Sequence, residues 1–141
     1  MNFKLLIEEH DRIAIMAVEF ERLVALPKPD MEALISLRAR LSAEVVRHLA
    51  HEDAFIYPEM IEHGSERIAR TARQFVDEFE DLRCDWGLFL EEWNPECILG
   101  DWIGFREEAH AIMARLRQRV QKENEILYPM ALQTGAIRLR T

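Results

Sequence analysis

Five ionisable side chains occupy positions where the surrounding sequence pattern favours apolar ones: His10, His48, Glu52, Arg119 and Glu123. Ionisable groups are costly to bury unless they are paired or bound to a cation, so five of them in one core need a common explanation. Histidine nitrogens and glutamate oxygens that converge from several helices are a standard means of holding a non-haem metal ion. These residue types therefore indicate metal binding.

The spacing of these residues places them in pairs on helical faces. Glu52 follows His48 by four residues, and Glu123 follows Arg119 by four. Residues four apart lie on one side of an α-helix, so each pair can reach one point in a helical core. The alternative to a metal is a structural network in which Arg119 pairs with both carboxylates and the histidines are hydrogen-bonded in the core. Arg119 could instead extend away from the centre toward solvent.

Four predicted helices position these residues. Apolar side chains recur at three- and four-residue spacing in runs within residues 3–24, 34–55, 72–93 and 102–130. Suitable N-caps for the last three are Asp30, Ser65 and Asp101. We expect Pro58 to kink or end the second helix and residues 96–100 to form a loop.

Helices joined by short connections run antiparallel to their neighbours in sequence. We therefore predict an all-α fold, an antiparallel up-down-up-down four-helix bundle, over residues 1–131. Residues 132–141 are predicted to be a C-terminal tail.

Composition excludes several classes of partner. The 141 residues include 26 acidic and 18 basic ones, for a net charge of −8. An acidic surface repels phosphate backbones and anionic lipid, so we expect no nucleic acid and no membrane partner. We expect neither a signal peptide nor a membrane-spanning stretch in this sequence. Cys84 and Cys97 are too few for a secreted disulfide framework, which favours a cytoplasmic location.

The two halves of the chain repeat a pattern. Residues 6–13 align with residues 75–82, and residues 48–58 align with residues 119–129. The repeat predicts two related helical hairpins about a pseudo-twofold axis, with matched positions facing each other across the core.

The motifs resemble the hemerythrin-like (HHE cation-binding) family. They are His10-Asp11, His48-x-x-x-Glu52 followed by Phe55-x-Tyr57-Pro58, and Glu123-Asn124-Glu125-Ile126-Leu127-Tyr128-Pro129. The resemblance spans nearly the whole chain. It implies a carboxylate-bridged di-iron centre, with one His from each of four helices and a Glu one turn beyond the His in the second and fourth. Members are associated with binding oxygen or nitric oxide, and with iron or redox sensing and storage.

Carried over residue by residue, the resemblance gives four metal ligands: His10, His48, Glu52 and Glu123. Two positions depart from the family pattern. Phe79 stands where the third helix should present a His, and Arg119 stands where the fourth should. Phe79 supplies no ligand, and the guanidinium of Arg119 stays protonated where a second cation would sit. The expected cofactor is non-haem iron, as a single metal ion or, if the centre has been lost, none.

Other polar residues are expected to have structural roles. His51 is expected to be solvated or to lie between helices, with a place behind the ligands as the alternative, and Glu8 and Glu9 are expected on a solvated face. Tyr57 and Tyr128 are expected to pack the ends of the bundle, although one hydroxyl could reach the site.

We predict a hemerythrin-like iron-binding protein, not an enzyme, that binds or senses oxygen, nitric oxide or iron. The expected partner is the metal ion; a small diatomic gas and a protein partner or homodimer are further candidates. The alternative is a metal-free degenerate bundle that works as a protein-interaction or signalling module.

Overall fold

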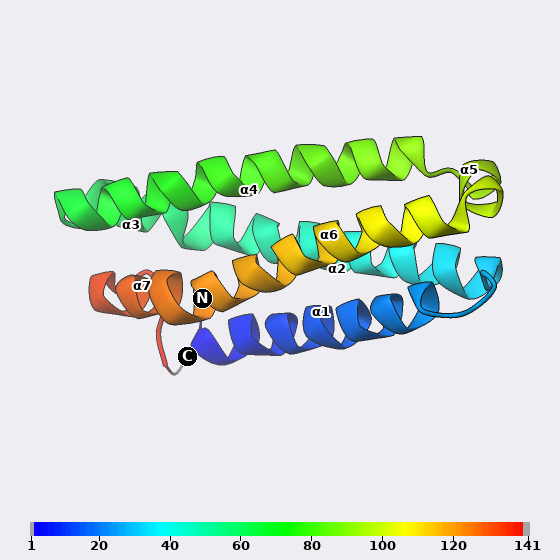
Figure 1. The fold of residues 1–141 in the computed structure, drawn as a ribbon. Helices are drawn as coiled ribbons and strands as arrows, with labels where there is room; N and C mark the ends of the chain where they lie inside the picture. The colour runs from blue at the N-terminus through cyan, green and yellow to red at the C-terminus, as the bar shows by residue number, and fades with distance from the viewer. Residues whose placement is uncertain (1, 140–141) are drawn as a thin grey trace.

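The computed structural model describes residues 2–139, so residue 1 of the predicted bundle and the last two residues of the predicted tail lie outside it. Its four long helices are α1 (Phe3–Val24), α2 (Met31–Phe55), α4 (Glu66–Glu92) and α6 (Trp102–Lys122). In Figure 1 the chain runs along α1, returns along α2, runs along α4 and returns along α6. The predicted all-α bundle is confirmed.

The predicted caps begin three of the long helices. The side chains of Asp30, Ser65 and Asp101 each accept a hydrogen bond from the backbone N–H three residues on, at 3.2, 3.2 and 2.9 Å. The prediction of a loop at residues 96–100 was wrong. These residues belong to the short helix α5 (Pro95–Gly100), because Asn94 caps it and proline is preset for the first helical position.

A proline interrupts the second helix near the polar residues. α2 ends at Phe55, and after Ile56 the chain continues as α3 (Tyr57–His63). Pro58 has no N–H to donate to the carbonyl four residues earlier, so the α-helical ladder cannot pass through it. The break predicted at this proline is confirmed.

Pro129 also lacks an N–H for the α-helical hydrogen-bond ladder, but here the helix widens before the proline and does not break. A π-helical turn, η1 (Glu123–Leu127), follows α6 directly, and α7 (Tyr128–Thr134) follows η1. The backbone N–H of Tyr128 donates to the carbonyl of Glu123, five residues back. The wider π turn lets residues five apart face the same side of the helix, which an α-helix does not.

Two residues of the predicted apolar runs are exposed. Phe55 is 52% and Ile126 43% exposed, whereas the residues that follow them, Ile56 and Leu127, are fully buried. The helix break and the π turn move the core-facing position by one residue at these two places.

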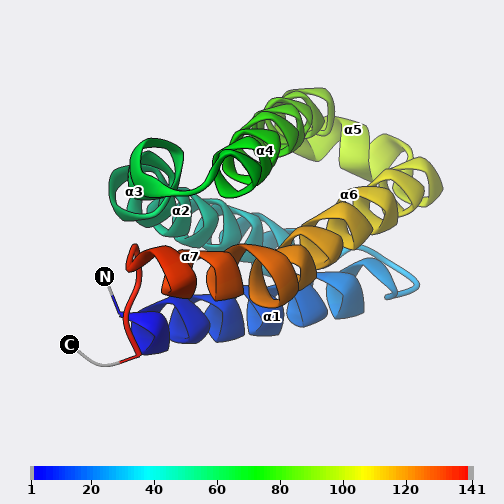
Figure 2. The same cartoon turned by 90° about the vertical axis from the view of Figure 1, so that its left-hand side faces the viewer.

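The last described residues pack back onto the bundle. The boundary predicted between residues 131 and 132 falls inside α7. Gly135 caps the C-terminus of this helix, with the left-handed φ of 78° that favours glycine. Ile137 is buried, and the N–H of Phe3 donates to the carbonyl of Arg138 at 2.6 Å. Figure 2 shows this segment returning to the start of α1.

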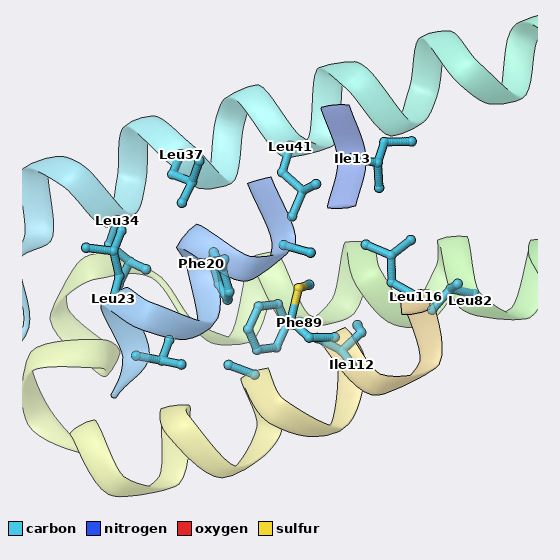
Figure 3. Close-up of a cluster of buried hydrophobic side chains, with 14 of the residues drawn as sticks. Ile13, Phe20, Leu23, Leu34, Leu37, Leu41, Leu82, Phe89, Ile112 and Leu116 are labelled. Atoms are coloured by element: carbon cyan, nitrogen blue, oxygen red, sulfur yellow. The ribbon is translucent and has the colours of Figure 1, made fainter. Parts of the chain in front are cut away.

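The apolar core consists of two clusters with a polar layer between them. The cluster at the α5 end includes Ile13, Phe20, Leu41, Leu116 and their neighbours, and Figure 3 shows these four side chains pointing inward from the long helices. The cluster at the α3 and α7 end includes Leu6, Ile56, Tyr57, Leu127 and Tyr128. Between the clusters lie buried polar residues: Glu9, His10, His48, Glu52, Arg119 and Glu123.

None of the helices within residues 2–139 combines the length and the apolar character that a membrane crossing requires.

Phe20→Ala should lower the free energy of unfolding by about 3–5 kcal/mol, because the fully buried ring leaves a cavity in the larger cluster. Urea denaturation followed by circular dichroism measures the change. Val18→Ala on the same helix is the control, since Val18 is 65% exposed and its loss should cost less than about 0.5 kcal/mol. A loss below about 1 kcal/mol for Phe20→Ala would contradict the described packing.

Candidate metal centre

The four predicted ligands come together in the polar layer. His10 projects from α1, His48 and Glu52 from α2, and Glu123 from η1, and each offers a ligand atom within 4.8 Å of the others. His10 Nε2 lies 2.7 Å from Glu123 Oε1. His48 Nε2 lies 2.7 Å from Glu52 Oε1, 3.0 Å from Glu123 Oε1 and 3.1 Å from His10 Nε2.

These separations suit the donor atoms of one metal ion. A cation with oxygen or nitrogen ligands at about 2.0–2.1 Å in octahedral geometry holds neighbouring donors about 3.0 Å apart. Two imidazoles and two carboxylates are ligands of the kind that iron, manganese and zinc accept. The residues present therefore fit a metal ion, both in spacing and in chemical type.

The outer nitrogens of both histidines contact oxygen acceptors. His48 Nδ1 lies 3.0 Å from Glu9 Oε1, and His10 Nδ1 lies 2.8 Å from the amide oxygen of Asn124. A carboxylate or amide oxygen only accepts, so Nδ1 carries the proton in each neutral imidazole. The lone pairs on Nε2 then face the common point, as they do in histidine ligands oriented by an outer shell of hydrogen bonds.

Glu9 belongs to this outer shell, so its predicted place on a solvated face was wrong. Glu9 is only 1% exposed, and its second oxygen lies 2.6 Å from Nδ1 of the partly buried His51. His51 thus lies between α1 and α2, and it contacts the candidate ligand His48 only through Glu9. Glu9 follows Leu6 by three residues and precedes Ile13 by four, a spacing that could have placed it on the core face.

Arg119 occupies the other side of the carboxylates. Its side chain is 5% exposed, so the alternative in which it extends to solvent is wrong. Its Nε donates to Glu123 Oε2 at 2.7 Å, and its terminal nitrogens donate to the Phe75 carbonyl at 2.7 Å and the Tyr57 hydroxyl at 2.6 Å. The guanidinium carbon also lies 4.7 Å from the centre of the Phe75 ring and 5.3 Å from that of Phe79.

The two carboxylate oxygens of each buried glutamate have different surroundings. Oε1 of Glu52 and of Glu123 faces the histidine nitrogens. Oε2 of Glu123 accepts from Arg119, whereas Oε2 of Glu52 accepts from the Tyr57 hydroxyl at 2.7 Å. Arg119 therefore reaches Glu52 through Tyr57, and the expected direct pair between Arg119 and Glu52 is replaced by this relay.

The sequence model of the hemerythrin HHE cation-binding domain matches residues 1–131. The chain belongs to the hemerythrin HHE cation-binding family. The predicted resemblance is confirmed over most of the chain, whereas comparison with curated proteins and with solved structures gave no match. The family description includes cation binding, and the His/Glu cluster of this member could hold a metal ion.

In this HHE domain, protons and Arg119 balance the buried carboxylates when no metal is bound. Burial opposes a charged His48, but hydrogen bonds with Glu123, Glu52 and Glu9 outweigh it and raise the pKa of His48 to about 12. Burial and the charge of Glu123 raise the pKa of Glu52 to about 8. Burial also opposes ionisation of Glu123, yet hydrogen bonds with His10 and His48 hold its pKa well below the usual range.

Both tyrosine hydroxyls reach the site, beyond the single hydroxyl expected as an alternative. Tyr57 contacts Glu52, and the Tyr128 oxygen lies 2.9 Å from His10 Nε2. Burial and the neighbouring carboxylates raise the pKa of both phenols, so both carry their protons in the absence of a cation. Each tyrosine follows a buried glutamate by five residues and precedes a proline, a signal repeated in both halves.

Arg119→Ala should destabilise the metal-free protein by about 3–5 kcal/mol, because it leaves Glu123 and the Tyr57 hydroxyl without their buried partner. Chemical denaturation in the presence of a chelator measures the loss. Arg115→Ala is the matched control on α6, since Arg115 is 41% exposed and pairs with Asp85 at the surface; it should cost no more than about 1 kcal/mol. Equal losses for the two variants would rule out a buried pairing role for Arg119.

Proposed function

We propose that this HHE domain binds a single non-haem iron ion, with His10, His48, Glu52 and Glu123 as ligands. One observation carries the proposal. Four buried donor atoms converge within 4.8 Å of one another, with four of their six pairs 2.7–3.1 Å apart. The opposite oxygens of the two carboxylates are already occupied by Arg119 and Tyr57. The point between the four donor atoms is suited to a cation. The opposite side of the carboxylates, where a second metal ion would lie, is filled by the Arg119 side chain.

Charge supports a single ion. Two carboxylates contribute two negative charges when ionised, and the permanently charged Arg119 cancels one of them. One negative charge is left beside two imidazole lone pairs, which a divalent cation can satisfy without a second metal. The same guanidinium opposes a second cation by repulsion at short range.

The biological role proposed is binding or sensing of iron, oxygen or nitric oxide, and not catalysis. Iron held by these residues would supply one-electron redox chemistry and a coordination position for a small diatomic ligand. The protein residues orient the ligands, exclude water and hold the protons that a cation replaces. A cytoplasmic location is also proposed, and it is supported by two free, exposed cysteines, which persist in reducing compartments.

Anaerobic addition of Fe(II) to chelator-treated protein should give one tightly bound iron per chain and a higher melting temperature. A ligand present at 100 times its dissociation constant stabilises a folded protein by about 2.7 kcal/mol. Metal analysis after desalting and a thermal scan are the measurements. His48→Ala should weaken iron binding by at least about 100-fold, since even outer-shell changes cost 10–100-fold.

The control is His63→Ala, because His63 is 62% exposed at the end of α3, and its removal should leave iron binding unchanged. Iron content near zero in the unaltered protein, with no change in melting temperature, would refute the proposal.

A metal-free interaction module is the second candidate, and a specific observation favours it. Within residues 2–139, no buried side-chain nitrogen or oxygen lacks a hydrogen-bond partner. The fold can therefore satisfy its buried polar groups with Arg119 and protons alone. In this alternative the bundle would present its surface to a protein partner, with the polar layer serving only its stability.

The double substitution Phe79→His and Arg119→His distinguishes the two candidates. It should raise iron content from one to two per chain and add the absorption of an oxo-bridged pair, because it removes the cation and supplies two nitrogens. Phe79→His alone should keep one iron, since Arg119 still opposes the second. If the unaltered protein holds no iron and the double variant acquires it, the interaction module is favoured; two irons in the unaltered protein would contradict both candidates.

A further inference from the structure

The Tyr128 hydroxyl lies among the proposed ligand atoms. Its oxygen is 2.9 Å from His10 Nε2 and 3.3 Å from His48 Nε2. It is also 3.2 Å from Glu52 Oε1 and 3.3 Å from Glu123 Oε1. Tyr128 is fully buried, so its oxygen has no access to solvent as an alternative partner. All four neighbours are the atoms that face the common point.

The hydroxyl of Tyr57 has different partners from that of Tyr128. Its oxygen accepts from Arg119 at 2.6 Å and donates to Glu52 Oε2 at 2.7 Å, on the opposite side of the carboxylates. Arg119 thus holds the oxygen of Tyr57, and it makes no such bond to Tyr128 among the contacts of the described chain. The neighbours of Tyr128 are carboxylate oxygens and, in the neutral imidazoles, nitrogen lone pairs.

The π turn is what places Tyr128 there. Tyr128 follows Glu123 by five residues, and the turn Glu123–Leu127 brings both onto the core side. The ring is also fixed in orientation, because it stacks on His10 with ring centres 5.1 Å apart and meets Phe3 edge-on at 6.2 Å. The hydroxyl position is therefore set by the backbone and by packing on both sides of the ring.

We propose that Tyr128 is a fifth ligand, a phenolate, of the iron held by His10, His48, Glu52 and Glu123. This inference rests on the proposed function. The oxygen stands 2.9–3.3 Å from the other donors, close to the separation of about 3.0 Å between neighbours in an octahedral sphere. As the iron–oxygen bond forms, the phenol O–H bond breaks. The water that the entering ion gives up takes the proton to bulk solvent, and no electrons are transferred.

A third anionic oxygen makes the site suited to Fe(III). Two carboxylates and a phenolate bring three negative charges, and Arg119 cancels one, so the charge of a trivalent ion is balanced more closely than in a site without the phenolate. Tyrosinate is an established axial ligand of iron in haem proteins, so the chemical pairing has precedent. A phenolate on Fe(III) gives a visible charge-transfer absorption that carboxylates and imidazoles do not give.

The test loads chelator-treated protein with Fe(III) and records iron content, visible absorption and resonance Raman spectra. The unaltered protein should show a visible band, whereas Tyr128→Phe should bind iron without that band. Tyr57→Phe removes the other tyrosine of the chain, so any phenolate band that this variant shows comes from Tyr128. The control is His63→Ala at the exposed end of α3, and it should keep both the iron and the band.

Isotope labelling gives a second measurement that does not depend on the folding of the Tyr128 variant. The chain contains two tyrosines, so Tyr57→Phe leaves Tyr128 alone. Growth on ring-deuterated tyrosine should then shift the Raman lines excited in the visible band. Bound iron without a phenolate band, or a band retained in Tyr128→Phe, would overturn the inference while leaving iron binding intact. Absence of bound iron in the unaltered protein would overturn the proposed function and the inference with it.

Discussion

The burial of two carboxylates, Glu52 and Glu123, is the constraint on which the rest of the centre depends. Both are almost fully removed from solvent, so each of their oxygens must find a donor or a cation inside the bundle. The Oε1 and Oε2 atoms of the two carboxylates have different partners. Arg119 and Tyr57 take the Oε2 atoms, and the histidine nitrogens face the Oε1 atoms. A fixed cation and a hydroxyl thus complete one side, and the other is left to protons or a metal ion.

The helices supply these partners by departing from regular α geometry at corresponding places in the two halves. A regular helix continuing past Glu52 or Glu123 would point a residue five positions later away from the core. The break at Ile56 and the π turn that begins at Glu123 both correct this, and each brings a tyrosine to its glutamate. The prolines that cause these irregularities lie one residue beyond the tyrosines. The cost of interrupting each helix is offset by the hydrogen bonds that the tyrosine hydroxyls make in the polar layer.

Much of this arrangement could be predicted from the sequence, and the part that could not has a physical reason. Apolar spacing predicts the long helices, and a polar residue at an apolar position, such as His48, stands out against that pattern. Glu9 did not stand out, because an acidic pair beside a histidine looks like a solvated surface until the neighbouring helix is placed. The sequence allowed one tyrosine hydroxyl at the site but did not place Tyr128 among the ligand atoms, because spacing rules for regular helices do not describe a π turn. The side on which Arg119 lies depends on tertiary contacts with Phe75 and Tyr57 that no local pattern encodes.

The two departures from the family pattern, Phe79 and Arg119, depend on each other because their side chains are in contact. A guanidinium buried at 5% exposure needs acceptors in its plane and a favourable surface on its faces. Glu123 and the Phe75 carbonyl supply acceptors, and the rings of Phe75 and Phe79 lie against the guanidinium carbon at 4.7 and 5.3 Å. A histidine at position 79 would replace an aromatic face with a second group that can become cationic. The phenylalanine therefore accommodates the arginine. Together they place a covalently attached charge where the family resemblance implies a histidine-bound metal.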